Sequence, residues 1–397
     1  MRIALVTETY PPEINGVAIT LGHLVGALAS RGHTLQVCRP RQGARDLPRR
    51  AAGIEEELFA GVPIPCYPSL RLGLPARRRL ERLWRAWQPD VVQVITEGPL
   101  GESALRAARR LGVPAGSDLH TRFEAYSRHY GMGWLRPLAE AYLRRLHNAA
   151  RCTIVPTREL RDELHACGYR NLAVVARGVD TALFAPERRS AALRARWGAS
   201  ENTLVVLYVG RIAPEKNIEL VLYAFEQMRR SRPDSRLVLV GDGPMRANLA
   251  HRYPYAVFCG MRCGVELAEH YASGDVFLFP STSETYGNVT VEAMASGLAV
   301  IAYDYAAAHE HIRHAANGLL APFDDSAAFI GLAAALANDP ARVRELGRQA
   351  CASARHIGWA QVADRFEEVL RTMVAGLPVT DTAAGRTLPL AAPVASR

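Results

Sequence analysis

Short apolar runs alternate with amphipathic segments through the first half of the chain, and the alternation starts again after about residue 200. In the first half the strand-like runs are Arg2–Thr7, Thr34–Cys38, Val91–Ile95, Val113–Ser117, Thr153–Pro156 and Leu172–Val175. In the second half they are Thr203–Gly210, Arg236–Val240, Ala256–Phe258, Val276–Phe279 and Ala299–Ala302. Such alternation favours parallel sheets with helices on both faces. We therefore expect an α/β protein with two doubly wound, Rossmann-like sheets.

The length of 397 residues exceeds what one hydrophobic core usually supports, so two domains are expected. We place the first domain at residues 1–180 and the second at 181–356, with the linker within Val179–Ser200. Pro340–Ala354 and Trp359–Met373 are expected to be helices, and residues 376–397 a disordered tail. A cleft between two such domains is a common ligand site.

Composition restricts the class of protein. No apolar run reaches the ~18 residues that a membrane-spanning helix needs, and the N-terminal residues run directly into a strand-like segment rather than a signal peptide. The seven cysteines form no Cys-x-x-Cys pair, and Cys259 and Cys263 lack the further ligands of a zinc site. A cytoplasmic protein is therefore expected.

The segment Ser283–Gly297 combines two carboxylates with the start of a helix. It follows the apolar run Val276–Pro280 and contains a helix expected at Val289–Ser296. Glu284 falls in the loop, and Glu292 lies eight positions later within the helix. Carboxylates accept hydrogen bonds from hydroxyl groups, and a helix start binds anions, so a nucleotide sugar would suit this segment. The alternative is a surface acid and a second acid stabilised by the helix dipole.

Two cations mark the beginning of the second half. Arg211 follows a strand-like run, and Lys216, the only lysine of the chain, precedes a helix five residues later. Two cations at a strand-to-helix turn suit a diphosphate leaving group, whose developing negative charge they would stabilise. An ordinary solvated loop is the alternative.

The chain resembles the retaining glycosyltransferases of family 4, which have the two-domain GT-B fold. The resemblance rests on the Glu-x7-Glu motif at Glu284 and Glu292 and on the pair Arg211 and Lys216. Further matching segments reach from the first residue almost to residue 373: Met1–Gly32, Ser117–Gly131, Arg177–Phe184, Val209–Lys216, Gly241–Pro244, Ser273–Pro280 and Asn317–Phe323. Within the family the chain is most similar to bacterial GDP-mannose-dependent α-mannosyltransferases and to sulfoquinovosyl- and glucosyl-diacylglycerol synthases.

This resemblance implies roles for the matching residues. Glu284 would contact hydroxyls of the donor sugar and Glu292 the ribose hydroxyls, neither acting as a covalent nucleophile. Arg211 and Lys216 would hold the diphosphate. The other expected donor-binding residues are Gly16, Gly287, Asn288 and Val289.

His120 resembles the active-site histidine of the family, whose ring or backbone carbonyl lies beside the C6 hydroxyl and the anomeric carbon of the sugar. A lone histidine outside such a matched segment would more commonly be a core or capping residue. Asp118 could orient the ring or only cap the next helix. The expected catalytic residues are therefore His120, Arg211, Lys216 and Glu284.

The resemblance also implies that the last helix, at 357–375, crosses back onto the first domain, and that no metal or other cofactor is required. The chain departs from the family at Asp304–His311, where Ala307 and Ala308 replace the usual glycines of a Gly-Gly-x-x-Glu loop. His309 and His311 would diverge on a helix, so we expect no metal site there.

The segment Arg71–Trp87 is the candidate for acceptor contact. Leu80, Leu83, Trp84 and Trp87 would share one helix face, and arginines occupy the rest. Such a face suits an anionic membrane surface, and the net charge of +9 is concentrated in the first 180 residues. A packing helix with solvated arginines is the alternative, and no nucleic-acid-binding pattern accompanies the charge. The expected acceptor or membrane contacts are Arg77, Arg78, Arg79 and Trp84.

The expected function is a retaining, metal-independent transfer of a hexose, preferably mannose from GDP-mannose, to a lipid or glycolipid. The protein would be peripheral at the inner face of the cell membrane, and its oligomeric state is not indicated. One alternative is a diacylglycerol glycosyltransferase that uses a UDP-sugar carrying glucose, glucuronate or sulfoquinovose. Another is a non-catalytic protein that binds a sugar nucleotide or a lipid. A phosphorylase would need its own lysine for pyridoxal phosphate.

Overall fold

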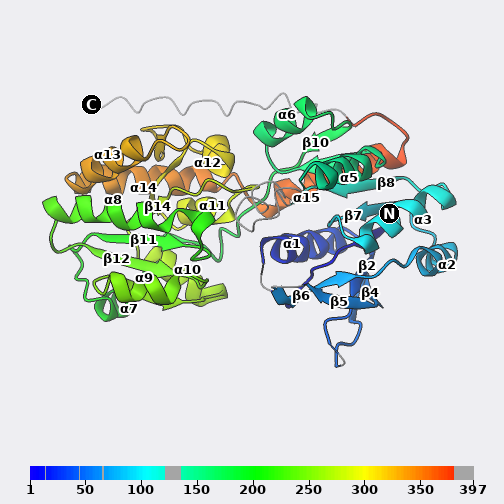
Figure 1. Ribbon diagram of the computed structural model, residues 1–397, viewed down its shortest axis with the longest axis horizontal. Helices are drawn as coiled ribbons and strands as arrows, with labels where there is room; N and C mark the ends of the chain where they lie inside the picture. Colours follow the sequence, from blue (N-terminus) through cyan, green and yellow to red (C-terminus); the bar gives the residue numbers. More distant parts are fainter. Residues whose placement is uncertain (14, 44, 65–66, 121–135, 380–397) are drawn as a thin grey trace.

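The computed structural model describes residues 1–13, 15–43, 45–64, 67–120 and 136–379. Two bodies are visible in Figure 1, one formed by the blue and cyan segments with the red C-terminal helix, the other by the green to orange segments. The tail predicted to be disordered comprises residues 376–397. From residue 380 onward it lies outside the described residues.

The first sheet has eight strands in the order β10-β9-β8-β7-β1-β2-β4-β3, and only the pair β3 and β4 is antiparallel. Its strands are β1 (Arg2–Val6), β2 (Thr34–Pro40), β3 (Arg50–Ala51), β4 (Ile54–Phe59), β7 (Val91–Val94), β8 (Ala115–Asp118), β9 (Thr153–Val155) and β10 (Leu172–Val174). A separate antiparallel pair is formed by β5 (Gly61–Ile64) and β6 (Tyr67–Gly73). The helices of this domain are α1 (Gly16–Ser30), α2 (Arg77–Trp87), α3 (Pro99–Leu111), α5 (Arg136–Asn148) and α6 (Arg158–Ala166).

The second sheet has six parallel strands in the order β13-β12-β11-β14-β15-β16. They are β11 (Val205–Val209), β12 (Arg236–Val240), β13 (Val257–Gly260), β14 (Val276–Phe279), β15 (Ala299–Tyr303) and β16 (Leu319–Ala321). The helices around it are α7 (Ala191–Arg196), α8 (Ile218–Ser231), α9 (Arg246–Arg252), α10 (Gly264–Ala272), α11 (Asn288–Ala295), α12 (Ala306–His311), α13 (Ser326–Ala337) and α14 (Pro340–Ala354). Two short 3-10 helices are η2 (Pro186–Arg188) and η3 (Pro214–Lys216).

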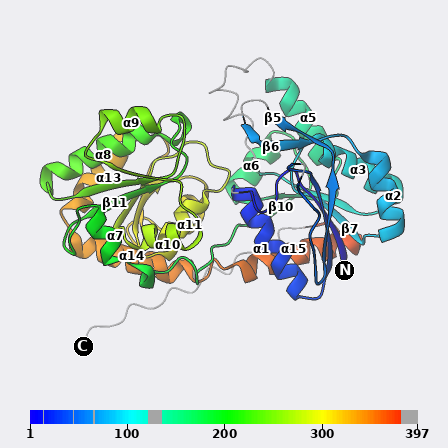
Figure 2. The ribbon, with the colours of Figure 1, turned by 90° about the horizontal axis from the view of Figure 1, so that it is seen from below.

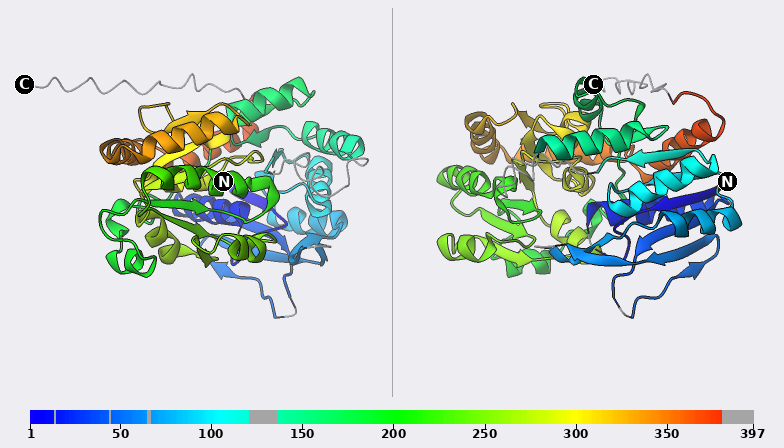
Figure 3. Two further views of the ribbon diagram at one scale, coloured as in Figure 1. Left: turned by 60° about the vertical axis from the view of Figure 1, so that its left-hand side comes forward. Right: turned by 45° about the vertical axis from the view of Figure 1, so that its right-hand side comes forward.

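Helices cover both faces of each sheet (Figure 3), and the period of two in β1 explains how the first sheet achieves this. Ile3 and Leu5 pack in one hydrophobic cluster with residues of α1, whereas Ala4 and Val6 pack in another with residues of α2 and α3. Both faces of the strand are thus buried, which requires an uninterrupted apolar run. The predicted α/β fold with two doubly wound sheets is confirmed.

The strand order reverses direction at β1 in the first sheet and at β11 in the second. β1 pairs with β2 and β7, and β11 pairs with β12 and β14. At such a point the helix after one strand lies on one face of the sheet, and the helix after the adjacent strand lies on the other face. A crevice therefore opens between the carboxyl ends of the two strands. The loops after β1 and β11 carry Gly16 and Arg211, which places both at a switch point of the strand order.

The C-terminal helix α15 (Trp359–Val374) packs on the first domain although it follows the second in sequence (Figure 2). Val362, Phe366 and Leu370 are buried in the same cluster as the β1 residues Ile3 and Leu5. The ring of Trp359 also stacks on His23 of α1 with 4.6 Å between the ring centroids. α15 therefore ties the end of the chain to the first sheet.

The range Val179–Ser200, within which the linker was predicted, includes residues that belong to the core of the second domain. Leu193 and Trp197 are buried in the core of the second domain, where α7 forms. Arg194 is also buried, and it donates to Asp275 at 3.1 Å and to backbone carbonyls of the second domain. The polar composition and the proline of this range suggested a linker, but they did not indicate that α7 is buried against the second sheet.

Candidate functional site

Lys216 and Glu284 form an ion pair at the carboxyl edge of the second sheet. Lys216 ends η3, two residues before α8, and Glu284 lies in the loop between β14 and α11. The hydroxyl of Ser281 donates to Glu284 Oε1 at 2.7 Å, and the Tyr305 hydroxyl donates to the Glu284 carbonyl at 2.7 Å. The carboxylate is therefore held in one orientation beside the ammonium group.

Arg211 lies at the same edge, in the loop that leaves β11. Its Nη1 is 3.5 Å from Glu215 Oε1, and its side chain remains about one-third exposed at 32%. The neighbouring loop after β12 approaches so closely that a Cβ on Gly241 would lie 1.9 Å from the Gly210 carbonyl oxygen. Only glycine fits there, and the two loops thereby bring their backbones together beside the two cations.

Glu292 lies within α11, where the Tyr271 hydroxyl donates to its Oε2 at 2.9 Å. Burial raises the pKa of Glu292 to about 7 and outweighs the effect of that hydrogen bond. A carboxyl group with this pKa changes charge near neutral pH. It can accept hydrogen bonds from a vicinal diol, such as a ribose, most strongly when it is ionised.

The start of α11 supplies free backbone donors. Gly287 precedes the helix with φ of +91°, a conformation that glycine adopts without strain. No side chain caps this helix and its first turn contains no acidic residue, so the N–H groups of Asn288 and Val289 and the helix dipole are left for an external anion. The predicted donor-binding residues of the second domain thus lie on two neighbouring segments, the loop with η3 after β11 and the loop with α11 after β14.

The two domains meet at this loop. The Thr285 hydroxyl donates to the His120 carbonyl at 2.9 Å, and the Tyr286 hydroxyl donates to the Arg177 carbonyl at 2.8 Å. Gly16 lies at the same junction, because a Cβ built on it would be 3.4 Å from Arg177 Nη1 and 3.9 Å from Asn288 Nδ2. The structure therefore brings together the predicted residues Gly16, His120 and Asn288.

Both ring nitrogens of His120 have partners. Arg177 Nη2 lies 3.0 Å from Nδ1, and Asp118 Oδ2 lies 3.4 Å from Nε2. A guanidinium group can only donate, so Nδ1 is the acceptor and the proton is on Nε2, facing Asp118. Burial, together with the positive charge of Arg177, lowers the pKa of His120, so the ring is neutral at pH 7. Asp118 thus orients the ring, which was one of its two predicted roles.

Two residues of this region were not predicted as site residues. Arg177 follows β10 and is the first residue of a segment that matched the family, which was the available signal. Glu97 follows β7, and its carboxylate accepts from the backbone N–H of His120, while burial raises its pKa to about 7. Nothing local in the sequence around Glu97 indicates that contact, because the partner lies on another strand.

The prediction that Trp84 contacts the acceptor or a membrane is wrong. Trp84 is 1% exposed, it packs with Leu80 in the core between α2 and the first sheet, and its Nε1 donates to Gln36 Oε1 at 3.1 Å. The apolar face of α2 was correctly identified, but this face points into the domain.

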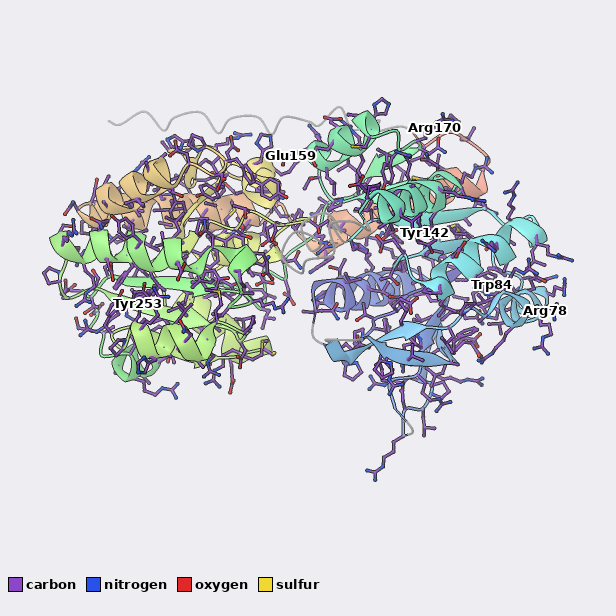
Figure 4. The ribbon with its side chains drawn as sticks, viewed as in Figure 1. Arg78, Trp84, Tyr142, Glu159, Arg170 and Tyr253 are labelled. Atoms are coloured by element: carbon purple, nitrogen blue, oxygen red, sulfur yellow. The ribbon has the colours of Figure 1, made fainter. Side chains whose placement is uncertain are left out.

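The arginines of α2 lie on its outer side. Arg77 and Arg79 have side chains 44% and 48% exposed, and Arg78 points away from the domain (Figure 4). α2 lies at the end of the first domain farthest from the second domain in Figures 1 and 2. These arginines are therefore remote from Lys216 and Glu284, and any contact they make with a membrane is separate from donor binding.

The loop that departs from the family contains one residue in the left-handed region. Ala306, rather than Ala307 or Ala308, has a positive φ of +53°. Its N–H donates to Glu159 Oε2 in the first domain at 3.1 Å. Alanine accepts this left-handed conformation at a cost of ~1–2 kcal/mol, so the interdomain hydrogen bond at this residue has a strained donor.

His309 and His311 diverge as predicted. His309 Nδ1 lies 2.7 Å from Asp304 Oδ1, whereas His311 Nε2 lies 2.8 Å from the Tyr286 hydroxyl. In the described part of the chain no three His, Cys, Asp or Glu side chains are grouped so that they could hold a metal ion. Among the described residues, no helix has the length and apolarity needed to cross a membrane.

Comparison with known proteins agrees with this geometry. Residues 14–183 match the model of "Glycosyltransferase Family 4", and residues 203–339 match that of "Glycosyl transferases group 1". A GDP-mannose-dependent alpha-mannosyltransferase of Mycobacterium tuberculosis is 37% identical over 81% of this chain and 84% of its own length. An alpha-monoglucosyldiacylglycerol synthase of Streptococcus pneumoniae is 30% identical over 76% of this chain and 71% of its own length.

Among solved structures, a sucrose-phosphate synthase of Thermosynechococcus elongatus superimposes with a TM-score of 0.77 at 20% identity, covering 94% of this chain and 99% of its own. That likeness supports the fold. The family models, the relatives and the arrangement of Arg211, Lys216, Glu284 and Glu292 agree, and we conclude that the chain belongs to glycosyltransferase family 4 and is a hexosyltransferase with the GT-B fold.

Proposed function

We propose that this glycosyltransferase transfers mannose from GDP-mannose to a lipid or glycolipid acceptor with retention of configuration. The preference for GDP-mannose is supported by the relative that is 37% identical, whose name specifies that donor. The lipid acceptor is supported by the name of the diacylglycerol glucosyltransferase relative. The observation that carries the proposal is the Lys216–Glu284 ion pair, because it joins a phosphate-binding cation to a hydroxyl-binding carboxylate.

The donor would lie across the carboxyl edge of the second sheet. Its diphosphate would contact Arg211, Lys216 and the free N–H groups at the start of α11. Glu284 would accept from hydroxyls of the sugar, and Glu292 would accept from those of the ribose. Because Lys216 already contacts Glu284, the sugar and the phosphate must bind next to each other.

Catalysis would be mainly electrostatic. As the bond between the anomeric carbon and the diphosphate breaks, the electron pair passes to the phosphate oxygen, and the cations stabilise the charge that develops there. No metal or other cofactor is part of the proposed reaction, since Arg211 and Lys216 supply the compensating charge. The acceptor hydroxyl would attack on the face from which the diphosphate leaves, with its proton passing to a phosphate oxygen, which retains the configuration.

The acceptor would approach from the first domain. His120, held by Asp118, Arg177 and Thr285, would present its backbone and neutral ring to the sugar. The exposed arginines on α2 would bring the first domain to an anionic membrane surface on the cytoplasmic side. This surface role concerns attachment and is independent of the donor site.

A thermal-shift panel tests the donor. GDP, UDP and ADP, each alone and as its sugar conjugate, are tested on the wild-type protein, on Lys216→Ala and Glu284→Gln, and on the exposed control Arg230→Ala. We expect GDP-mannose to raise the melting temperature of the wild type and of the control, because ligand binding stabilises the folded state by mass action. Lys216→Ala should lose this shift and about 100-fold or more in kcat/KM. Stabilisation by UDP conjugates alone would favour the UDP-sugar alternative, and binding without transfer would favour the non-catalytic one.

A further inference from the structure

Arg177 occupies the junction of the two domains. It follows β10 of the first sheet, and its carbonyl accepts from the Tyr286 hydroxyl of the second domain at 2.8 Å. The side chain is 7% exposed, and its Nη2 contacts Nδ1 of His120 at 3.0 Å. This arginine is thus buried next to the predicted active-site histidine.

The positive charge of Arg177 is compensated only from a distance within the described residues, by Glu284 and Asp118. None of them forms a carboxylate ion pair with the guanidinium, and its buried Nε has no hydrogen-bond partner among them. Burial lowers the pKa of Arg177, which indicates that the charged form is poorly solvated. A buried charge without a partner costs several kcal/mol, so such a residue is normally retained for a partner that is not part of the chain.

A comparison with Arg194 makes the difference clear. Arg194 is also buried, at 3% exposed, but its guanidinium bonds to the Asp275 carboxylate and to the carbonyls of Ser273, Ser200 and Thr203. Arg194 Nε also lacks a hydrogen-bond partner among the described residues, but both terminal nitrogens of Arg194 are used. Arg177 keeps donors free.

Two helix starts lie beside Arg177: α11 has no side-chain cap, whereas the Asn15 side chain accepts from the Ala18 N–H at the start of α1. Arg177 Nη1 lies 3.4 Å from the point where a Cβ on Gly16 would be, and Asn288 Nδ2 lies 3.9 Å from that point. Gly16 begins α1 and Asn288 begins α11, and neither helix has an acidic residue in its first turn. Two helix N-termini, one from each domain, therefore meet beside one buried cation, and all three features favour negative charge.

We propose that Arg177 is a third cation of the donor site and binds an oxygen of the sugar-side phosphate between the starts of α1 and α11. The inference rests on the proposed function, because it requires a nucleoside diphosphate donor. Lys216 and Arg211 approach that diphosphate from the second domain, whereas Arg177 approaches it from the first domain. The sugar-side phosphate of the leaving diphosphate is then held by both domains. Cleavage of its bond to the sugar therefore depends on the contact between the two domains.

Arg177 could bind the phosphate or could only position the His120 ring. Comparing the affinities for nucleoside monophosphates and diphosphates distinguishes these two roles. A monophosphate carries only the phosphate next to the ribose, so its affinity is insensitive to Arg177 if Arg177 binds the sugar-side phosphate. Isothermal titration with GDP and GMP, and with UDP and UMP, is therefore compared for wild type, Arg177→Gln and Arg177→Lys. Arg106→Gln serves as the control, because it removes the same charge from a position on the first domain whose side chain is 64% exposed.

We expect Arg177→Gln to weaken diphosphate binding by about tenfold or more and to leave monophosphate binding unchanged. Arg177→Lys, which keeps the charge and is the fallback if the glutamine variant does not fold, should lose less. Equal losses for mono- and diphosphate, or no loss for either, would overturn the inference while leaving the proposed function intact. A wild-type protein that binds neither diphosphate would overturn both.

Discussion

Two helix starts, one in each domain, are capped by each other's carboxylates. Glu159 of α6 accepts from the N–H of Ala306 at 3.1 Å, and Glu310 of α12 accepts from the N–H of Arg158 at 2.8 Å. Figure 4 shows Glu159 where α6 approaches α12. This reciprocal pair joins the two domains close to the donor site, so its removal should favour separation of the domains.

The magnitude follows from the energies of helix caps. Replacing a capping side chain by alanine costs ~1 kcal/mol, and some of this is lost to solvent screening because both contacts are partly exposed. The double variant Glu159→Ala with Glu310→Ala should therefore destabilise the joined state by ~1–2 kcal/mol, a factor of roughly 5–30 in its population ratio. If the donor needs residues of both domains, its apparent dissociation constant rises by at most the same factor.

Two measurements check this expectation. Isothermal titration with GDP gives the affinity, and small-angle scattering gives the radius of gyration, which should increase in the double variant. Asp162→Ala is the matched control, because Asp162 is on the same helix with its side chain 68% exposed and pairs with its neighbour Arg161. Wild-type affinity together with an unchanged radius in the double variant would refute the reasoning.

Three further expectations concern single residues. Because burial raises the pKa of Glu292 to about 7, the folded state holds that proton between pH 4.5 and 7 while the unfolded chain releases it, so stability should fall and donor affinity should increase as pH rises through this window. In melting and titration series Glu292→Gln should lose the pH dependence of donor affinity and reduce that of stability, of which Glu97 retains a part. Gly287→Ala should lower the free energy of unfolding in urea by ~1–2 kcal/mol, because the φ of Gly287 is +91°. An unchanged urea midpoint would contradict this backbone conformation. Trp84→Ala should lower the free energy of unfolding by ~3–5 kcal/mol, because Trp84 is buried. Arg78→Ala should leave stability unchanged and reduce the fraction of protein that sediments with anionic vesicles. The reverse pattern would refute our assignment of the two faces of α2.

The sequence was sufficient for the α/β class, the two sheets and most strands, because the period of apolar residues depends only on which faces a segment buries. The helix at Asn288–Ala295 was predicted to within one residue, since Gly297 with φ of +82° ends it in the way a C-terminal glycine usually does. By contrast, the sequence did not indicate α7, which lies within the range predicted to contain the linker. The burial of α7 depends on the second sheet, which local composition does not describe.

The structure brings predicted site residues together where a motif fixes their spacing within one loop. Sequence reasoning missed Arg177 and Glu97, whose contacts come from other strands. Glu284 and Glu292 share one loop and helix, so their separation in sequence fixes their separation in space. The periodicity of α2 identified the apolar face of Trp84 but not whether a sheet or a membrane would cover it.

The sequence by itself determined that this chain is a family 4 glycosyltransferase, because family motifs are local and survive in the order of residues. Only the tertiary structure decided that Arg177 lies against His120, 57 positions earlier in the chain, and that its charge has no described carboxylate partner. Compensation of a buried charge is a property of everything packed around it. That environment exists only after both sheets have folded and their domains have met.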